Sequence, residues 1–372
     1  MTKKIGILTL SASDNCGSLL QAYALQEFLR IRYDCKVEII NFISEASHQV
    51  YDMFPKGFWK HPKKTFFTIK HYKSIAKQKK GYNIFRQKYL NMTPQVYSSI
   101  NNLKELIAYD IIIVGSDQIW NVKMMDFDEA FFIPWRTPAK KIAYAASLGK
   151  TVIFPNNKVQ FVKKCLSDFK GISIREKEGL TQLKEVTDIN VCLAADPTLL
   201  LEKDTWNKII GNPLVEDEYI FFYSWSYPDI EMNKIVQKYS KKKGIPAYVI
   251  NSSKWYRYRP EQFDFILYRE SGPITFLNLM KYAKYVFVQS FHGAVFANIF
   301  QKNFYFLNEQ KYGYLDFRSA NLLENLHQMN RVIHEWSDLQ KAESMEIKYE
   351  SIEMLNLLKQ SIDFLDMAVL GE

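Results

Sequence analysis

SFHGAVFANIF, residues 290–300, is the stretch that best indicates how the chain folds. It follows YAKYVFVQ, residues 282–289, an apolar run rich in β-branched and aromatic residues that is typical of a buried strand. The apolar spacing after Gly293 predicts the beginning of a helix. His292 is therefore expected where a strand ends and a helix begins, a place where open α/β sheets bind ligands and free N–H groups favour anions. A histidine at this place could instead cap or pack the turn.

Two other segments place a polar turn directly after an apolar strand. DIIIV, residues 110–114, predicts a buried strand and is followed by the turn GSDQ, which contains Asp117. Near the N-terminus, IGILTL at 5–10 predicts a strand, SASDNCG a polar loop, and SLLQAYALQEFLRIR at 18–32 an amphipathic helix. Both segments therefore bring polar side chains to the carboxyl edge of a sheet.

Strand and helix patterns alternate along the chain, which predicts βαβ units and a mostly parallel sheet in each half. Further strands are predicted at VEIINF, KIAYAA, GISI and VCLAA in the first half and at YIFFYSW, PAYVI and NFYFL in the second. The 372 residues exceed what one core usually serves, and the turn at Asp196 is expected to mark the domain junction. We predict an α/β protein with two Rossmann-like domains facing a cleft, at 1–205 and 206–340, and a C-terminal helix at 341–372.

Six segments of the chain resemble the polysaccharide pyruvyl transferase family. They occur in the family's order, roughly between residues 5 and 325: DNCGSLLQAYALQ, VGSDQIWN, KIAYAASLG, GISIRE, AADPTLLL and SFHGAVFANIF. The resemblance implies a fold similar to that of the GT-B glycosyltransferases, in agreement with the alternation of strands and helices.

The resemblance also implies an enzyme of polysaccharide biosynthesis. Such an enzyme transfers the pyruvyl group of phosphoenolpyruvate onto two hydroxyls of a sugar, so that a ketal forms and phosphate is released. The donor carries a phosphate and a carboxylate, and the planar fork of arginine suits both groups. A general acid must protonate the methylene carbon, and each sugar hydroxyl must lose a proton. The reaction requires no metal and no redox cofactor, so neither is expected.

The donor is expected to meet the residues around His292, the best candidate for the acid or for a phosphate ligand. Arg175 in GISIRE and Arg318 in DFRSANLLENL match arginines of the family, and the resemblance assigns both to donor binding. Arg175 could instead pair with Glu176 or Glu178, and Arg318 could cap the helix that begins after it.

The chain departs from the family two residues before His292. Many members carry an arginine there, whereas this chain has Ser290, whose hydroxyl can bond a phosphate oxygen without supplying charge. We therefore expect Ser290 and Gly293 to contact the donor, and Arg318 or Lys311 to supply the missing cation.

The acceptor sugar is expected to meet the turn that follows residue 114. Asp117 is the candidate base for the sugar hydroxyls, and Gln118 and Asn121 are candidate hydrogen-bonding partners. Trp120 could stack on the sugar ring or belong to the core. Three further acceptor-binding candidates lie in the first loop and helix: Asn15, Gly17 and Gln21.

Residues 56–90 form a basic, aromatic insert. They include eleven Lys or Arg and no Asp or Glu, and so account for the whole net charge of +9. Cations interleaved with aromatic residues favour an anionic membrane surface, a phosphate-bearing acceptor or nucleic acid. Nucleic acid is the least favoured partner, because no binding motif accompanies the charge. The insert could also be a solvated helical pair that covers the first domain.

The chain is expected to be cytoplasmic, with peripheral contact to the inner face of a membrane. Its apolar runs are shorter than a membrane-spanning helix, and MTKKIGILTL predicts a strand rather than a signal peptide. Four scattered cysteines without a CxxC pair indicate reduced thiols and predict neither a disulfide nor a zinc site.

Two other functions are compatible with the sequence. A glycosyltransferase that uses a nucleotide sugar could have the same fold, and would need an acidic ribose-binding residue such as Glu309 or Asp316. A non-catalytic accessory protein could have kept the scaffold after losing donor binding, as the presence of Ser290 would allow.

Overall fold

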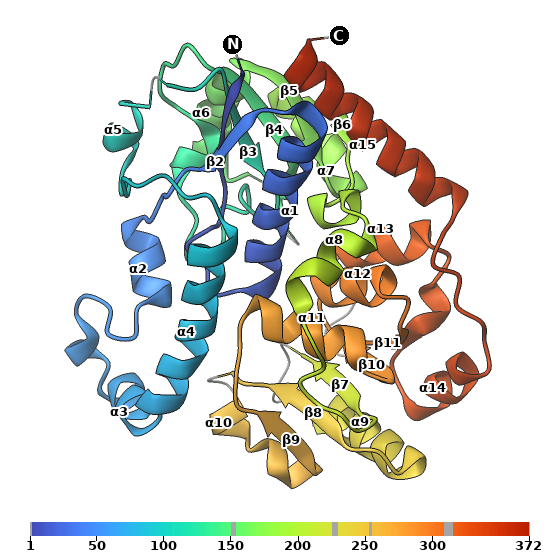
Figure 1. Ribbon diagram of the computed structural model, residues 1–372. Helices are drawn as coiled ribbons and strands as arrows, with labels where there is room; N and C mark the ends of the chain where they lie inside the picture. Colours follow the sequence, from blue (N-terminus) through green and yellow to red (C-terminus); the bar gives the residue numbers. More distant parts are fainter. Residues whose placement is uncertain are drawn as a thin grey trace. The chain divides into compact units, whose positions relative to one another are not determined.

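The structure is a computed structural model that describes residues 2–106, 108–149, 154–224, 230–252, 255–308 and 315–371. The chain forms two compact units, and Figure 1 shows the elements of each. The first unit contains Met1–His61, Phe85–Leu201 and Leu355–Glu372, and the second contains Pro62–Ile84 and Glu202–Met354.

The first unit is built on a parallel sheet. Among the described residues, this sheet has six strands in the order β2-β1-β3-β4-β5-β6. β3 is buried along its whole length, as expected for a central parallel strand that is covered on both faces. The strands are β1 (Lys4–Leu8), β2 (Lys36–Ile39), β3 (Ile111–Gly115), β4 (Lys140–Ala146), β5 (Phe169–Ile174) and β6 (Val191–Leu193).

The longest helix of this unit's N-terminal part, α1 (Cys16–Tyr33), begins at a side-chain cap. The Asn15 side-chain oxygen accepts hydrogen bonds from Gly17 N at 2.8 Å and Ser18 N at 3.4 Å, and such a cap stabilises a helix by about 1 kcal/mol. The other helices with residues in this unit are α2 (Glu45–Tyr51), α5 (Ile100–Leu103), α6 (Asn156–Leu166), α7 (Lys177–Val186) and α15 (Ile352–Leu370).

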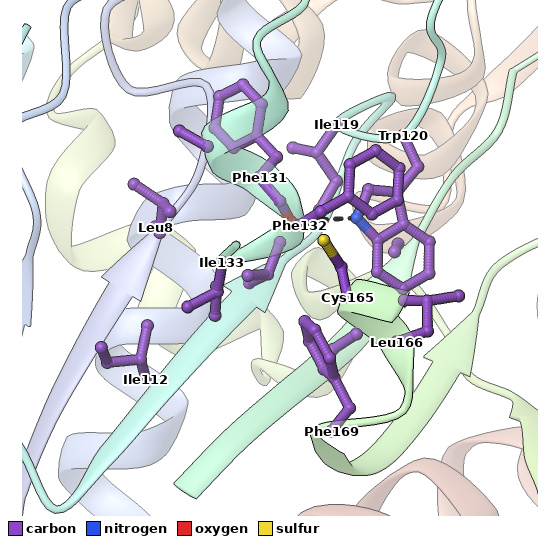
Figure 2. Packing of buried hydrophobic residues seen from close by; sticks show 14 of the residues in the cluster. Leu8, Ile112, Ile119, Trp120, Phe131, Phe132, Ile133, Cys165, Leu166 and Phe169 are labelled. Atoms are coloured by element: carbon purple, nitrogen blue, oxygen red, sulfur yellow. Dashed lines mark hydrogen bonds between the residues drawn. The ribbon is translucent and has the colours of Figure 1, made fainter. Parts of the chain in front are cut away.

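Trp120 lies in the apolar core of the first unit (Figure 2). Its side chain is 1% exposed, and its ring stacks on Phe132 with 5.5 Å between the ring centroids. The indole Nε1 donates to Phe131 O at 3.0 Å. An indole so enclosed has no face open to a sugar ring. Of the two roles that the sequence leaves open for Trp120, the core role is the one it has.

The second unit is also built on a parallel sheet. In the part of the chain that the structure describes, this sheet has six strands in the order β12-β11-β10-β7-β8-β9. Two parallel sheets with helices confirm the predicted α/β fold class. The strands are β7 (Ile220–Tyr223), β8 (Ala247–Ile250), β9 (Phe265–Tyr268), β10 (Tyr285–Val288), β11 (Asn303–Leu307) and β12 (Val332–Ile333).

Two helices of the second unit, α3 (Pro62–Lys70) and α8 (Lys203–Ile210), precede its first strand. The helices that follow its strands are α9 (Ile230–Lys243), α10 (Trp255–Tyr258), α11 (Pro273–Tyr282), α12 (Phe291–Ile299), α13 (Phe317–Asn325) and α14 (Trp336–Glu343). Within the described ranges, no helix in either unit combines the length and the hydrophobicity needed to cross a bilayer.

The basic insert at 56–90 is helical for most of its length. It contains α3 and α4 (Tyr72–Tyr89), and α4 belongs to the second unit up to Ile84 and to the first unit from Phe85 onward. Phe85 is fully buried and its ring lies 6.0 Å from that of Tyr23 on α1. The end of the insert is therefore part of a core, while α3 is mostly exposed.

Candidate active site

Polar loops of the first unit lie at one edge of its sheet, because parallel strands share the edge at which they end. The loop after β3 carries Asp117, Gln118 and Asn121, Arg175 follows β5, and Asp196 follows β6. Hydrogen bonds join several of these side chains to one another and to α1. The structure thus brings together side chains from distant parts of the sequence.

Asp117 has a left-handed backbone conformation, with φ of 63°. This conformation costs a non-glycine residue roughly 1 kcal/mol and persists where the surroundings impose it. The carboxylate Oδ2 accepts from Ser18 Oγ at 2.5 Å, and Oδ1 accepts from Arg175 Nη2 at 3.4 Å. Ser18 lies in the first turn of α1, where the helix dipole favours a negative charge. The site therefore holds the Asp117 carboxylate in one orientation.

Arg175 bridges two carboxylates. Its guanidinium is 2% exposed, Nη1 pairs with Asp196 Oδ2, and Nη2 lies 3.4 Å from Asp117 Oδ1. Asp196 Oδ1 in turn accepts from Thr198 Oγ1 at 2.6 Å and from Thr198 N at 3.0 Å. Asp196 does form a turn, since it caps the 3₁₀ helix Pro197–Leu200, but it also fixes Arg175. That second contact could not be read from the sequence.

Gln118 and Asn121 form an amide pair beside Asp117. Asn121 Nδ2 donates to Gln118 Oε1 at 2.8 Å. Gly149, just after β4, has φ of +72°, and a Cβ there would lie 2.4 Å from Gln118 Oε1 and 2.5 Å from Asn121 Nδ2. Only a glycine leaves room for this pair. Gly149 is not among the site residues predicted from the sequence, although a glycine shortly after a strand is a recognisable signal.

Asn15, Gly17 and Gln21, which the sequence suggests as the floor of the acceptor site, lie at the start of α1. Gly17 N donates to the Asn15 cap, and Gln21 Nε2 donates to Thr9 Oγ1 at 2.9 Å and to Ser18 O at 2.8 Å. Gln21 is fully buried. Its direct contacts therefore fix the end of β1 and the first turn of α1.

Arg86, near the end of α4, holds the loop between β1 and α1. Its guanidinium donates to the carbonyl oxygens of Ser11 and Ala12 at 2.8 Å and of Ser13 at 2.7 Å. It also pairs with Asp14 at 2.9 Å. One side chain thus binds four successive residues of a loop at the edge of the sheet. From the sequence, Arg86 is only one of the cations of the insert, and no pattern predicts its role at this loop.

Tyr51, the last residue of α2, lies near the same loop. Its hydroxyl donates to Asp126 Oδ2 at 2.6 Å. Burial, and then the Asp126 carboxylate, raise the pKa of the Tyr51 hydroxyl well above its ordinary value. Asp117 raises this pKa slightly further, and a hydrogen bond with Ser13 partly opposes the rise. The hydroxyl therefore stays protonated and can act as a hydrogen-bond donor at any ordinary pH.

In the second unit, His292 lies in the first turn of α12, directly after β10, as the sequence predicts. Ser290 caps this helix, since its Oγ accepts from Gly293 N at 3.1 Å. Its hydroxyl hydrogen can still be donated to an oxygen of a ligand. A Cβ on Gly293 would lie 2.9 Å from Ser290 Oγ and from Val288 Cβ, so glycine permits this close turn. His292 is 9% exposed.

Arg318 lies beside the start of α12. Its Nε donates to Asp316 Oδ1 at 2.9 Å, and its guanidinium lies 5.8 Å from the centre of the Phe291 ring. Asp316, and not Arg318, caps α13, because Asp316 Oδ1 accepts from Arg318 N at 3.2 Å. The structure therefore brings Arg318 to the residue next to His292. Lys311 and Glu309, which the sequence analysis also named, lie outside the described residues.

Metal-binding chemistry has no candidate group in the part of the chain that the structure describes. No set of three or more His, Cys, Asp or Glu side chains there is placed to hold a metal ion. The four cysteines are free thiols.

A comparison with protein families matches residues 15–311 to the family described as polysaccharide pyruvyl transferase. No curated protein matches the chain. The matched range includes α1 and the loops after β3, β5 and β10, and so contains most of the candidate site residues described above.

Solved structures of sugar enzymes have the same fold. A glycosyltransferase from Rickettsia africae ESF-5 aligns with a TM-score of 0.55 at 11% identity, over 100% of both chains. The UDP-GlcNAc 2-epimerases of Methanocaldococcus jannaschii and Neisseria meningitidis each align with a TM-score of 0.51 at 10% identity, over 98% of this chain and 99% of theirs. At such low identity these similarities show the fold alone, and they confirm the predicted GT-B-like fold.

Proposed function

The chain belongs to the polysaccharide pyruvyl transferase family, and from this membership we propose that it transfers the pyruvyl group of phosphoenolpyruvate to two hydroxyls of a sugar. Protonation of the methylene carbon makes C2 of the donor electrophilic. One sugar hydroxyl adds to C2, phosphate leaves, and the second hydroxyl closes the ketal. Each hydroxyl loses one proton, and the methylene group becomes a methyl group.

Asp117 is proposed as the base that accepts a proton from the sugar. This proposal rests chiefly on one observation, the orientation of its carboxylate by Ser18 and Arg175 in a strained turn at the edge of the sheet. Gln118 and Asn121 lie in the same turn and offer amide groups for neighbouring sugar hydroxyls. A base must lie within hydrogen-bond reach of the proton it removes, and such a turn can supply that geometry.

His292 is proposed as the acid that protonates the donor or as a ligand of its phosphate. The N-terminus of α12, the Ser290 hydroxyl and Arg318 are proposed to bind the phosphate and the carboxylate. Arg318 would then supply the cation that the family places two residues before the histidine.

We assign Arg175 a positioning role instead of the donor contact that the family resemblance implies. Its guanidinium is buried and already binds Asp117 and Asp196, so it orients the base. A residue that acts through Asp117 should affect turnover more than donor affinity.

The acceptor is proposed to be a polysaccharide or a lipid-linked glycan precursor, which the enzyme meets in the cytoplasm at the inner face of a membrane. The basic insert supports this location. A nucleotide-sugar glycosyltransferase is the alternative function, but it is supported only by the fold, since Asp316 caps α13 and binds Arg318.

Phosphate release from phosphoenolpyruvate, measured with a mixed pool of glycan acceptors, tests the proposed function. The purified chain should release phosphate only when acceptor is present. Release of a nucleoside diphosphate from nucleotide sugars would instead support the glycosyltransferase, and no turnover of either donor class would support an accessory protein.

A further inference from the structure

Exposed apolar side chains gather on α3 and at the start of α4. Phe66 is 70% exposed and Ile69 is 61% exposed, and their spacing of three residues puts them on neighbouring positions of one helix face. Tyr72, at the start of α4, is 50% exposed. A soluble chain rarely leaves such large side chains together in water, so this group indicates an interaction surface.

Lysines surround these apolar side chains. Lys63, Lys64, Lys70 and Lys73 are all exposed. Among the described residues of the insert, the first lysine in the sequence that has a carboxylate partner is Lys77. Its Nζ lies 3.4 Å from Glu270 Oε1. In the part of the chain that the structure describes, no carboxylate forms an ion pair with Lys63, Lys64, Lys70 or Lys73.

The opposite side of α3 and α4 is fixed to the second unit. His71 stacks on Tyr256 with 5.1 Å between ring centroids, and Asn251 Nδ2 donates to Ser74 O at 3.4 Å. Thr68, between Phe66 and Ile69, is buried. Because these contacts fix the rotation of α3 about its axis, the side chains of Phe66 and Ile69 face the solvent.

We propose that this surface binds anionic lipid bilayers peripherally. The α3 surface is defined by Lys63, Lys64, Phe66, Ile69, Lys70, Tyr72 and Lys73. In this arrangement Phe66 and Ile69 enter the boundary between headgroups and acyl chains, and the lysine side chains extend to the lipid phosphates. Each lysine near an anionic leaflet raises the partition coefficient roughly five-fold, and salt screens this attraction.

Charge decides the kind of partner. A second copy that docked through the same surface would bring two lysine-rich surfaces together and be repelled, whereas an anionic partner would be attracted. Nucleic acid is anionic too, but the outward aliphatic Ile69 has no ring to stack on a base, whereas it can be buried among acyl chains. Membrane binding would bring the enzyme to a lipid-linked acceptor, and its biological purpose therefore rests on the proposed function. Binding of the chain to vesicles is tested without the reaction.

Sedimentation with lipid vesicles provides the test. The chain should bind vesicles that contain phosphatidylglycerol, should not bind vesicles of phosphatidylcholine alone, and should be released by high salt. The triple variant Lys63→Gln/Lys64→Gln/Lys70→Gln should bind about 10²-fold more weakly at low salt. Phe66→Ser/Ile69→Ser should bind at least about 10-fold more weakly.

Matched control variants distinguish the effect of this surface from that of the net charge of the chain. Lys163→Gln/Lys164→Gln/Lys170→Gln removes the same charge from exposed lysines of the first unit, and Ile352→Ser removes an exposed apolar side chain that lies elsewhere. Both should bind as the unmodified chain does. Equal recovery on neutral and anionic vesicles, or equal losses in the α3 variants and their controls, would overturn the proposal.

A second measurement does not depend on comparing affinities. Vesicles whose acyl chains carry bromine should quench the fluorescence of the tryptophan added in a Phe66→Trp variant. They should not quench the fluorescence of the tryptophan added in an Ile352→Trp variant. Phosphate release from phosphoenolpyruvate with a soluble acceptor should be the same for the α3 variants and the unmodified chain. Loss of vesicle binding with this activity intact separates the surface from the reaction, whereas an inactive chain that still binds vesicles contradicts only the proposed function.

Discussion

The guanidinium of Arg175 donates through Nη2 to Oδ1 of Asp117 at 3.4 Å while its Nη1 pairs with Asp196. A planar group held at two corners cannot rotate, so the loops after β3, β5 and β6 are tied together at one point. Asp117 is thereby fixed in a strained conformation that its own backbone would not favour.

Replacing Arg175 with lysine should lower turnover more than donor affinity. Lysine keeps the charge but cannot bridge both carboxylates, so Asp117 should lose its orientation. We expect kcat to fall at least about 10-fold with the KM for phosphoenolpyruvate nearly unchanged. Steady-state kinetics measure both, with the exposed Arg136→Lys as control. A higher KM for phosphoenolpyruvate at constant kcat would instead indicate that Arg175 binds the donor.

Asp117→Asn should abolish most of the activity and keep the fold. The amide fills the same volume and can still accept from Ser18, but it cannot take up a proton. Turnover should fall by about 10² to 10⁴, the usual contribution of a general base. Asp188→Asn, at an exposed position of the same unit, should have full activity. A folded Asp117→Asn variant with full turnover would exclude Asp117 as the base.

His292→Ala should lower turnover by about 10² or more, because it removes the proposed acid while leaving α12 capped by Ser290. The unfolding temperature should change little, and His327→Ala, at an exposed position of the same unit, should be fully active. Near-normal turnover in a folded His292→Ala chain would show that His292 only packs the turn.

Arg86→Gln should loosen the loop between β1 and α1. The variant loses most of the charged hydrogen bonds to Ser11, Ala12, Ser13 and Asp14, and unfolding should become easier by roughly 2 kcal/mol. The KM for the acceptor should rise, since this loop leads into the predicted floor of the site. Lys88→Gln, on an exposed position of α4, is the control for lost charge. Equal effects of the two substitutions on denaturant unfolding would contradict the account.

Gly149→Ala compared with Gly244→Ala isolates the clash with the amide pair. Both glycines have positive φ, +72° and +68°, but nothing lies within 4 Å of a Cβ on Gly244. Each alanine costs roughly 1 kcal/mol for its positive φ, and only Gly149→Ala must also displace Gln118 and Asn121. Urea unfolding and turnover should both be more impaired in Gly149→Ala. Similar losses of stability and turnover in the two variants would mean that displacing Gln118 and Asn121 has no effect on the site.

Strands and helices of this chain were largely predictable, because buried parallel strands are continuous apolar runs. DIIIV forms most of β3, KIAYAA forms most of β4, and the helix expected at 18–32 is α1. The predicted C-terminal helix is confirmed as α15, although it begins at Ile352 and not at 341. The end of α14 also falls in the predicted segment, because the local pattern of apolar residues does not show where one helix ends before another begins.

Contacts between distant loops could not be predicted. The partners of Arg175 lie 58 and 21 residues away from it, and no local pattern specifies them. Arg86 likewise lies 72 to 75 residues from the loop that it holds. In contrast, the spacing of Tyr82, Phe85 and Tyr89 on α4 was a readable sign that the end of the basic insert is buried.

The most direct test of the proposed function is the mass of the acceptor after reaction with phosphoenolpyruvate in D₂O. If the chain forms a pyruvate ketal, the acceptor gains the mass of pyruvate minus one water, and the new methyl group carries one deuterium taken from the solvent by the acid-catalysed step. An acceptor that gains a hexose, or that stays unmodified while phosphate is released, would contradict pyruvyl transfer.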